Sequence, residues 1–410
     1  MNTNKDFWET ESIGIKEQLI TGATEGTDFL RDPSYDGERY EVGLPWKEDC
    51  VPSTDSYQMC SSCLKSLRNK LSQEPALLHE YDNIIKEQEK NGIIERAEEL
   101  CGKEEINKGI HFSPHHAVVC KDRETTKVRI VYDRSAKSSK QGRSLNDCLE
   151  TGPNFIPHIF DMLAKFRWNS VGLTADIKKA FLNVGIKKED RDMLRFLWFK
   201  DPTAENPEIV QYRFNCLVFG LRPSPSILCS TIKHHLKFYR QSEPEMAEML
   251  ENSLYVDDLI TGDEDKAAFA IYKKSKAIMA EGGFRLRKWN SNSASLIEEI
   301  TKLEVPNNQT PASQQTCDFP DITKEDDKSY AKSSTSLSSP FSSDGNTVKV
   351  LGVNWDTAND EIFFNFAELY KYGKSLPVNK RSVLKLTAKI FDPLGFLSSF
   401  VIQLKILFQV

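Results

Sequence analysis

The feature that most constrains how this chain can fold is the tetrapeptide Tyr255-Val256-Asp257-Asp258, in which two adjacent carboxylates stand among apolar residues. The apolar pair Leu259-Ile260 follows directly, so we predict a tight turn between two short strands. Neighbouring carboxylates are costly there unless cations or hydrogen-bond donors neutralise them. A divalent metal site would account for the pair, and a solvated hairpin tip is the alternative interpretation.

A further carboxylate lies upstream, where Asp176 ends the apolar run Leu173-Thr174-Ala175. Taken alone, Asp176 could equally cap the start of a helix. If both segments belong to one sheet, however, their ends bring three carboxylates together. Three carboxylates can hold two magnesium ions about 4 Å apart, which is the arrangement used in phosphoryl transfer.

The order of local patterns predicts an α+β fold with a mostly antiparallel sheet. Helical spacing occurs within 66–100, 156–166, 225–239 and 383–410, and another helix is predicted to start at Lys178. Strand patterns occur at 115–120, 127–133, 170–176, 193–199, 209–216, 347–355 and 361–366. Residues 306–346 are rich in Ser, Thr, Asp, Lys and Gln, a composition that predicts a disordered insertion.

Charge and cysteine content bear on partners and compartment. The net charge of -6 argues mildly against a nucleic-acid binder, but residues 121–143 contain eight Lys or Arg against three Asp or Glu. No basic leader and no run of about eighteen apolar residues is present, so a membrane span is not expected. Nine scattered cysteines favour free thiols in a reducing, cytoplasmic compartment.

In their order along the chain, these motifs resemble those of reverse transcriptases, and within them the polymerase region of BEL/Pao-type long-terminal-repeat retrotransposon polyproteins. The resemblance covers roughly residues 108–356. Tyr35–Lys47 is similar to the segment that precedes the polymerase in such polyproteins, and Ala388–Leu397 to the one that follows it. The resemblance implies an RNA-directed DNA polymerase with fingers and a ferredoxin-like palm, followed by an incomplete helical thumb-connection region.

This resemblance divides the chain into five predicted segments. They are a pre-polymerase linker at 1–65, fingers and palm at 66–300, the disordered insertion at 301–346, a primer-grip-like hairpin at 347–370, and a truncated post-polymerase helical segment at 371–410.

The resemblance also implies a metal centre. Asp176, Asp257 and Asp258 match the carboxylates of the palm, with Asp176 and Asp257 as principal ligands and Asp258 in support. Ile177 would add its backbone carbonyl. The expected cofactor is a pair of Mg²⁺ ions, for which Mn²⁺ could substitute.

Nucleotide-binding residues follow from the same motifs. Arg129, with Lys127 as a weaker candidate, matches the fingers cation that contacts the triphosphate, and its guanidinium suits phosphate oxygens. Phe181 matches the aromatic residue that excludes a ribose 2′-hydroxyl, and Gly220 the loop beneath the nascent base pair. Lys288 could supply a cation near the leaving pyrophosphate.

Each of these residues also has an ordinary structural interpretation. Phe181 could be a core aromatic residue at a helix start, and Arg129 and Lys288 could be solvated surface charges. The chain departs from the retroviral pattern at Phe219, where that pattern has Gln. The departure weakens only the expectation that a side-chain amide assists the nucleotide.

Primer contacts are expected from Tyr255 and from a hairpin that contains Leu351, Gly352 and Trp355. The implied partners are an RNA or DNA template with its primer, and deoxynucleoside triphosphates. The protease, RNase H and integrase of such polyproteins are expected outside this chain, which ends as a truncation would. An intact element would place the protein in virus-like particles.

Two other functions remain open from the residues. A transposon-derived fragment could keep the palm and only bind nucleic acid or a partner protein. A nucleotidyl cyclase shares a palm-like core with paired carboxylates, but the Arg129 strand and the primer-grip-like hairpin disfavour it.

Overall fold

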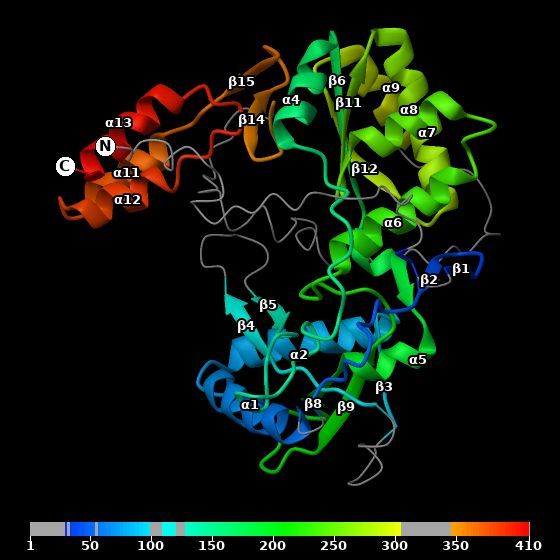
Figure 1. Cartoon of the computed structure of the whole chain (residues 1–410), viewed down its shortest axis with the longest axis vertical. Helices are drawn as coiled ribbons and strands as arrows, with labels where there is room; N and C mark the ends of the chain where they lie inside the picture. The colour runs from blue at the N-terminus through cyan, green and yellow to red at the C-terminus, as the bar shows by residue number, and fades with distance from the viewer. Residues whose placement is uncertain are drawn as a thin grey trace, which may run out of the picture.

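The computed structural model describes residues 29–30, 33–53, 56–98, 109–119, 128–304 and 346–409. The described residues form two lobes, with a group of C-terminal helices beside the upper one (Figure 1). The predicted insertion at 306–346 falls, except for Asn346, outside the described residues, as does Lys127. In the described part of the chain, no helix is both long and apolar enough to cross a membrane.

The upper lobe is built around a sheet of four antiparallel strands. Its order is β10 (Leu254–Tyr255), β11 (Asp258–Asp263), β6 (Val171–Ile177) and β12 (Leu286–Ser291). Alternate residues of a strand face opposite sides of a sheet. Leu173 and Ala175 enter the main hydrophobic core, and Ile260, which is paired with Thr174, faces a second, smaller core.

Helices cover both faces of this sheet (Figure 1). On the side of the smaller core, α4 (Ile159–Trp168) packs on β11 and β6 through Met162, Leu163 and Phe166. On the other side lie α6 (Ser224–Lys237), α7 (Pro244–Ser253), α8 (Asp265–Glu281) and α9 (Ala294–Glu304). An antiparallel sheet with helices on its faces confirms the predicted α+β class.

The lower lobe combines two helices with two small antiparallel sheets. α1 (Ser56–Leu71) and α2 (Pro75–Lys90) accompany the sheet β3 (Ile94–Arg96), β9 (Ile209–Phe214) and β8 (Arg195–Phe199). The strands predicted at 115–120 and 127–133 are present as β4 (His115–Val119) and β5 (Val128–Tyr132), which pair as an antiparallel hairpin. The sequence predicts a segment boundary between residues 65 and 66, but α1 continues across it. The helix begins earlier because Cys60 and Leu64 extend its buried face toward the N-terminus. The five segments themselves stay predictions.

The described part of the N-terminal segment belongs to the fold. β1 (Ser34–Tyr35) pairs with β2 (Tyr40–Val42), and β2 runs parallel to β7 (Val184–Ile186). The Asp190 carboxylate accepts from the Leu44 amide at 2.6 Å and from Trp46 Nε1 at 2.8 Å. A polar composition suggested a linker here, but its few apolar and aromatic residues dock onto strands from later in the chain.

The helix predicted from Lys178 is wrong. Lys179 adopts a left-handed conformation with φ of 52°, and only the single 3-10 turn η2 (Ala180–Asn183) precedes β7. Two short helical segments follow, α5 (Lys188–Arg191) and η3 (Asp192–Leu194).

A three-stranded sheet and three helices form the C-terminal part. The single strand predicted at 347–355 is wrong, because Leu351 and Gly352 have φ of 47° and 90° and turn the chain back on itself. The strands are β13 (Thr347–Val350), β14 (Val353–Asp356) and β15 (Glu361–Phe363). The helices are α11 (Ala367–Ser375), α12 (Lys380–Thr387) and α13 (Ser398–Gln409).

Candidate active site

One edge of the upper sheet carries a row of charged side chains across three neighbouring strands. In the register of β11, β6 and β12, Asp258 lies directly opposite Asp176, and Asp176 lies directly opposite Arg287. Residues directly opposite each other in an antiparallel pair project to the same face, with their Cβ atoms about 5 Å apart. Two carboxylates and one guanidinium therefore share one face at the end of the sheet.

The third carboxylate, that of Asp257, stands in the turn between β10 and β11. The turn is strained, because the β-branched residue Val256 has φ of 59°, a left-handed conformation that such residues rarely adopt. The turn is tied to the central strand where Ile177 N donates to Asp257 O at 2.8 Å. The predicted ligands Asp176, Ile177, Asp257 and Asp258 are thus neighbours in space.

Asp257 also bears on helix α6. The pKa of the Cys229 thiol is raised to about 11, chiefly by burial, while the Lys233 cation acts to lower it and the Asp257 carboxylate to raise it. The Asp257 carboxylate therefore lies near enough to Cys229 of α6 to disfavour its thiolate. Asp257 is thus tied to the central strand through Ile177 N and lies close to α6.

Cations neutralise Asp176 in this structure. Arg287 Nε lies 3.4 Å from Asp176 Oδ1, and Lys288 Nζ lies 3.2 Å from Asp176 Oδ2. Within the described residues, no group of three or more His, Cys, Asp or Glu side chains is arranged as a metal site. Even so, Asp176 Oδ1 is shielded from solvent and accepts no hydrogen bond from the described residues. An oxygen-only donor set with such an oxygen fits a hard divalent cation.

Phe181 lies on η2, which directly follows the strand that carries Asp176. Its ring is 6% exposed and packs against the ring of Phe219, with centroids 4.5 Å apart. Gly220 comes next in the chain and has φ of 90°, and a Cβ there would lie 3.0 Å from Tyr132 O. Glycine is required at this turn because the backbone of β5 approaches it so closely.

Arg129 lies on β5 in the other lobe, in register with Val118 of β4. Its Nη2 atom is shielded from solvent and makes no hydrogen bond to the described residues. The structure therefore does not bring Arg129 into contact with the carboxylates of the upper sheet.

The predicted primer contacts gather around the smaller core. Trp355 is fully buried, its ring meets that of Phe166 edge-on at 4.9 Å, and its Nε1 donates to Asp360 Oδ1 at 3.0 Å. Leu351 is also buried, whereas Tyr255 is half-buried against the same core. The side chains of Leu351 and Trp355 are therefore occupied by the core, and the backbone of the turn is what remains for a contact. The primer contacts themselves stay predictions.

Gly352 is required for a reason that its sequence context did not reveal. A Cβ on Gly352 would lie 2.8 Å from the ring of Phe391. The hairpin turn therefore packs against the segment between α12 and α13, in which Asp392 Oδ1 and Oδ2 accept from the backbone amides of Phe396 and Leu397.

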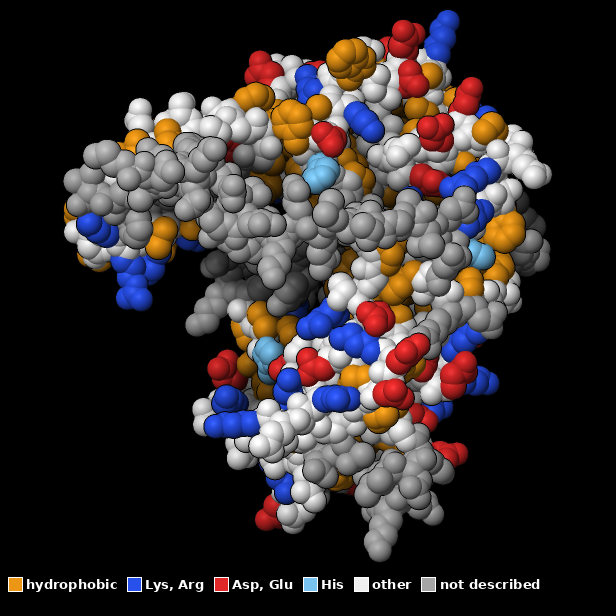
Figure 2. All heavy atoms as spheres, in the orientation of Figure 1, with side chains coloured by type: hydrophobic (Ala, Val, Ile, Leu, Met, Phe, Trp, Pro, Cys, Tyr) orange, Lys and Arg blue, Asp and Glu red, His pale blue; other side chains and the backbone are white. Residues whose placement is uncertain are grey.

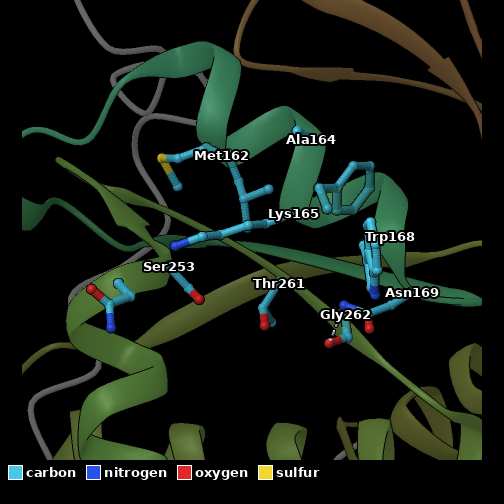
Figure 3. Close-up of a pocket in the computed structure, with 11 residues that line it drawn as sticks. Met162, Ala164, Lys165, Trp168, Asn169, Ser253, Thr261 and Gly262 are labelled. Atoms are coloured by element: carbon cyan, nitrogen blue, oxygen red, sulfur yellow. Dashed lines mark hydrogen bonds between the residues drawn. The ribbon is translucent and has the colours of Figure 1, made fainter.

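A cavity among the described residues is separate from the charged row. It encloses about 380 Å³ between α4, the end of α7 and β11 (Figure 3). Its walls include Phe166, Trp168, Ser253 and Gly262, and none of the predicted site residues lines it. The position of this pocket alone would therefore not have pointed to the predicted site residues.

Sequence reasoning missed Arg287. It directly precedes Lys288, which the sequence did indicate, but nothing local shows that Arg287 lies opposite Asp176. A bulge between Arg287 and Asn290 and a left-handed Lys288 with φ of 52° set which side chains point to the carboxylates. Only the pairing register of β12 with β6 reveals this contact.

The surface charge in view is mixed. Figure 2 shows Lys, Arg, Asp and Glu side chains interspersed over the lower lobe of this face, without a field of one sign. The basic excess of residues 121–143 lies partly outside the described residues, so the visible surface shows only part of it.

Two protein-family models match this chain, and the first of them spans the residues of the charged row. Residues 120–333, more than half of the chain, match the model described as reverse transcriptase (RNA-dependent DNA polymerase). Residues 379–410 match the model described as Pao retrotransposon-like RNaseH-like domain. A search of curated proteins finds no match.

The second match qualifies one prediction, namely that the RNase H region lies outside this chain. It assigns residues 379–410 to a model with the RNaseH-like name, although Asp392 is the only acidic residue among them. A metal-dependent nuclease needs several carboxylates, so these residues cannot form such a site alone. Together, the motif series, the antiparallel sheet that carries the carboxylates and the two family matches show that the chain belongs to the reverse transcriptases, as the RNA-directed DNA polymerase region of a Pao/BEL-type retrotransposon.

Proposed function

We propose that this chain performs templated nucleotidyl transfer with two divalent metal ions, held by Asp176 and Asp257 with support from Asp258 and from the carbonyl of Ile177. The observation that carries the proposal is the cross-strand register that sets Asp258 opposite Asp176, one residue after Asp257. Magnesium bound there, or manganese in its place, would favour ionisation of the primer 3′-hydroxyl and stabilise negative charge on the phosphate oxygens.

In the proposed reaction the primer 3′-oxygen forms a bond to the α-phosphorus of a deoxynucleoside triphosphate. The bond between the α-phosphorus and its bridging oxygen breaks, and pyrophosphate leaves. Lys288 lies within 3.2 Å of Asp176 and supplies a cation, and a proton donor, for the leaving group. The ring of Phe181 would lie under the sugar and exclude a 2′-hydroxyl.

The other predicted contacts complete the proposal. Arg129 and Lys127 would approach the triphosphate from the fingers, since a guanidinium makes bidentate bonds to phosphate oxygens. Gly220 would lie beneath the nascent base pair, and Tyr255 and the Leu351–Gly352 turn beside the primer. Contacts with the template would be mostly to backbone, hence sensitive to salt and independent of sequence.

The cellular setting is part of the same proposal. The six described cysteines are free thiols, which supports a reducing compartment such as the cytoplasm. Within an intact element the chain would act beside its protease, RNase H and integrase in virus-like particles.

Primer extension on RNA and DNA templates tests this function. With Mg²⁺ the wild-type chain should extend a primer, and Asp257→Asn should lower the rate by at least about 10²-fold while leaving the melting temperature nearly unchanged. The matched control is Asp263→Asn, at the far end of β11. Absence of extension in the wild type, or equal rates for wild type and Asp257→Asn, would contradict the proposal.

A second candidate function is binding without catalysis. The specific observation in its favour is that Arg287 and Lys288 already neutralise Asp176. A chain of this kind would shift a primer-template duplex in a gel and extend nothing, and neither Mg²⁺ nor Mn²⁺ would alter its affinity for the duplex.

A further inference from the structure

One buried side chain joins the fingers to the turn that carries Phe219. Asn146 Nδ2 donates to Ser135 Oγ at 2.9 Å and to Gly220 O at 2.8 Å, and its Oδ1 accepts from Arg222 N at 2.9 Å. Ser135 lies just beyond the end of β5, the strand of Arg129, and Arg222 lies just before α6. Asn146 is 6% exposed, so these bonds are shielded from water.

The geometry admits only one orientation of the Asn146 amide. Both N–H donors are used, and the carbonyl oxygen faces a backbone N–H. The backbone of Asn146 is held as well, since its amide donates to Arg134 O at 3.1 Å. An isosteric aspartate would set a carboxylate oxygen against Gly220 O, which leaves buried polar groups unpaired.

The turn held in this way positions an exposed aromatic ring. Asn146 makes hydrogen bonds to Gly220 and Arg222, the residues on either side of Leu221. Gly220 directly follows Phe219, so these bonds fix the backbone next to the Phe219 ring. Phe219 is 46% exposed and packs on the buried ring of Phe181. The turn lies close to β5, because a Cβ added at Gly220 would lie 3.0 Å from Tyr132 O.

We propose that Asn146 is a positioning residue for the nucleotide site: it fixes the Phe219 turn against Phe181 and against the strand of Arg129, and thereby sets affinity for the triphosphate and selection of the deoxyribose. The proposal rests on the proposed polymerase function. Asn146 itself touches no substrate. Phe219 acts as the backing of the Phe181 ring, which gives a role to the position where the retroviral pattern has Gln.

Steady-state extension with dNTPs and with rNTPs tests the role of Asn146. Asn146→Asp should raise KM for dNTP about tenfold, change kcat far less, and lower the preference for dNTP over rNTP about tenfold. The matched control is Asn169→Asp, because Asn169 Nδ2 also donates to a glycine carbonyl, Gly262 O, at 2.8 Å, near the opposite end of β6. The control should leave KM and sugar preference unchanged.

A purely structural role predicts a different result. If Asn146→Asp lowers kcat and the melting temperature together, with KM and sugar preference as in the wild type, the positioning role is overturned. If the variant does not melt cooperatively, Phe219→Leu replaces it, since an exposed ring can be shortened without breaking the amide bonds. Phe219→Leu should lose sugar preference at an unchanged melting temperature, and retention of that preference overturns the proposal.

A separate binding measurement distinguishes failure of the polymerase function from failure of the role proposed for Asn146. If wild-type protein extends no primer, the proposed function fails, and Asn146 is then tested by the equilibrium affinity for a fluorescent deoxyadenosine triphosphate. Weaker binding by Asn146→Asp than by Asn169→Asp supports the positioning role. Equal binding by the two variants overturns it.

Discussion

The charged end of the upper sheet and the β4–β5 hairpin of the lower lobe carry the two predicted halves of the nucleotide site, and they are held in different ways. β6 has a hydrogen-bonded neighbour on each side, so Asp176 is fixed between Asp258 and Arg287. Among the described residues β5 pairs with β4 alone, and Arg129 Nη2 makes no hydrogen bond to them. The predicted metal ligands are thus held from both sides, whereas Arg129, the predicted triphosphate contact, stands on a two-stranded hairpin.

The hairpin gains its support from a neutral histidine. His115 of β4 is buried between the Tyr81 hydroxyl and the Leu197 carbonyl, and its Nε2 lies 2.8 Å from Leu197 O. Burial lowers the pKa of His115 to about 4, and the Arg134 cation adds to this effect. In the upper sheet, by contrast, the neighbouring strands bring charged groups together, with Asp176 between Asp258 and Arg287.

The largest effect should come from the charged end of the upper sheet. Asp176→Asn should lower the rate of primer extension on the order of 10³-fold, because the central carboxylate of the row loses its charge. The fold should persist, which melting followed by circular dichroism checks. If Asp176→Asn lowers the rate of primer extension less than an Arg129 variant does, the carboxylate end of the sheet is not the more important of the two regions.

Acid should weaken the lower lobe next. An unfolded His115 binds a proton below about pH 6.5 and the folded one only near pH 4, so stability is full above pH 6.5 and falls as the pH drops between these values. The loss should reach roughly 3 kcal/mol for this residue. Urea unfolding of His115→Gln should show a flatter dependence on pH. The exposed His79→Gln serves as control, and identical slopes for His115→Gln and wild type would contradict the prediction.

Arg129 should matter for substrate and not for folding. Arg129→Ala should raise KM for dNTP about tenfold, the scale of a hydrogen bond to a charged group. The free energy of unfolding should change by less than about 0.5 kcal/mol, because Arg129 Nη2 makes no hydrogen bond to the described residues. A marked loss of stability would show that β5 depends on Arg129 for its own structure.

The smallest effect concerns Arg287. Removal of its charge in Arg287→Gln should raise the affinity for Mn²⁺, measured by electron paramagnetic resonance without nucleotide, about fivefold, since Asp176 is then less neutralised. The control Arg240→Gln breaks an ion pair with Glu251 elsewhere in the same lobe and should leave the affinity unchanged. Weaker Mn²⁺ binding by Arg287→Gln would show that the cation supports the metal ligands.

Local patterns predicted well those elements whose signal lies within a few residues. The strand that ends at Asp176, the β4–β5 hairpin and the turn before Asp258 are present, because alternation and turn residues act over that distance. The helix from Lys178 and the single strand at 347–355 are wrong because left-handed residues interrupt them. Lys179 and Leu351 are not residue types that announce such a conformation.

By itself, the sequence determined the carboxylate motif, the family that the motif series indicates, and the α+β class. Only the tertiary structure decided which side chains meet: Arg287 opposite Asp176, Asn146 between Ser135 and Gly220, and Phe391 over Gly352. The physical reason is that strand register and loop contacts arise from hydrogen bonds and burial between segments far apart in the chain. A shift of one residue in the register of β12 against β6 would turn Arg287 to the opposite face of the sheet.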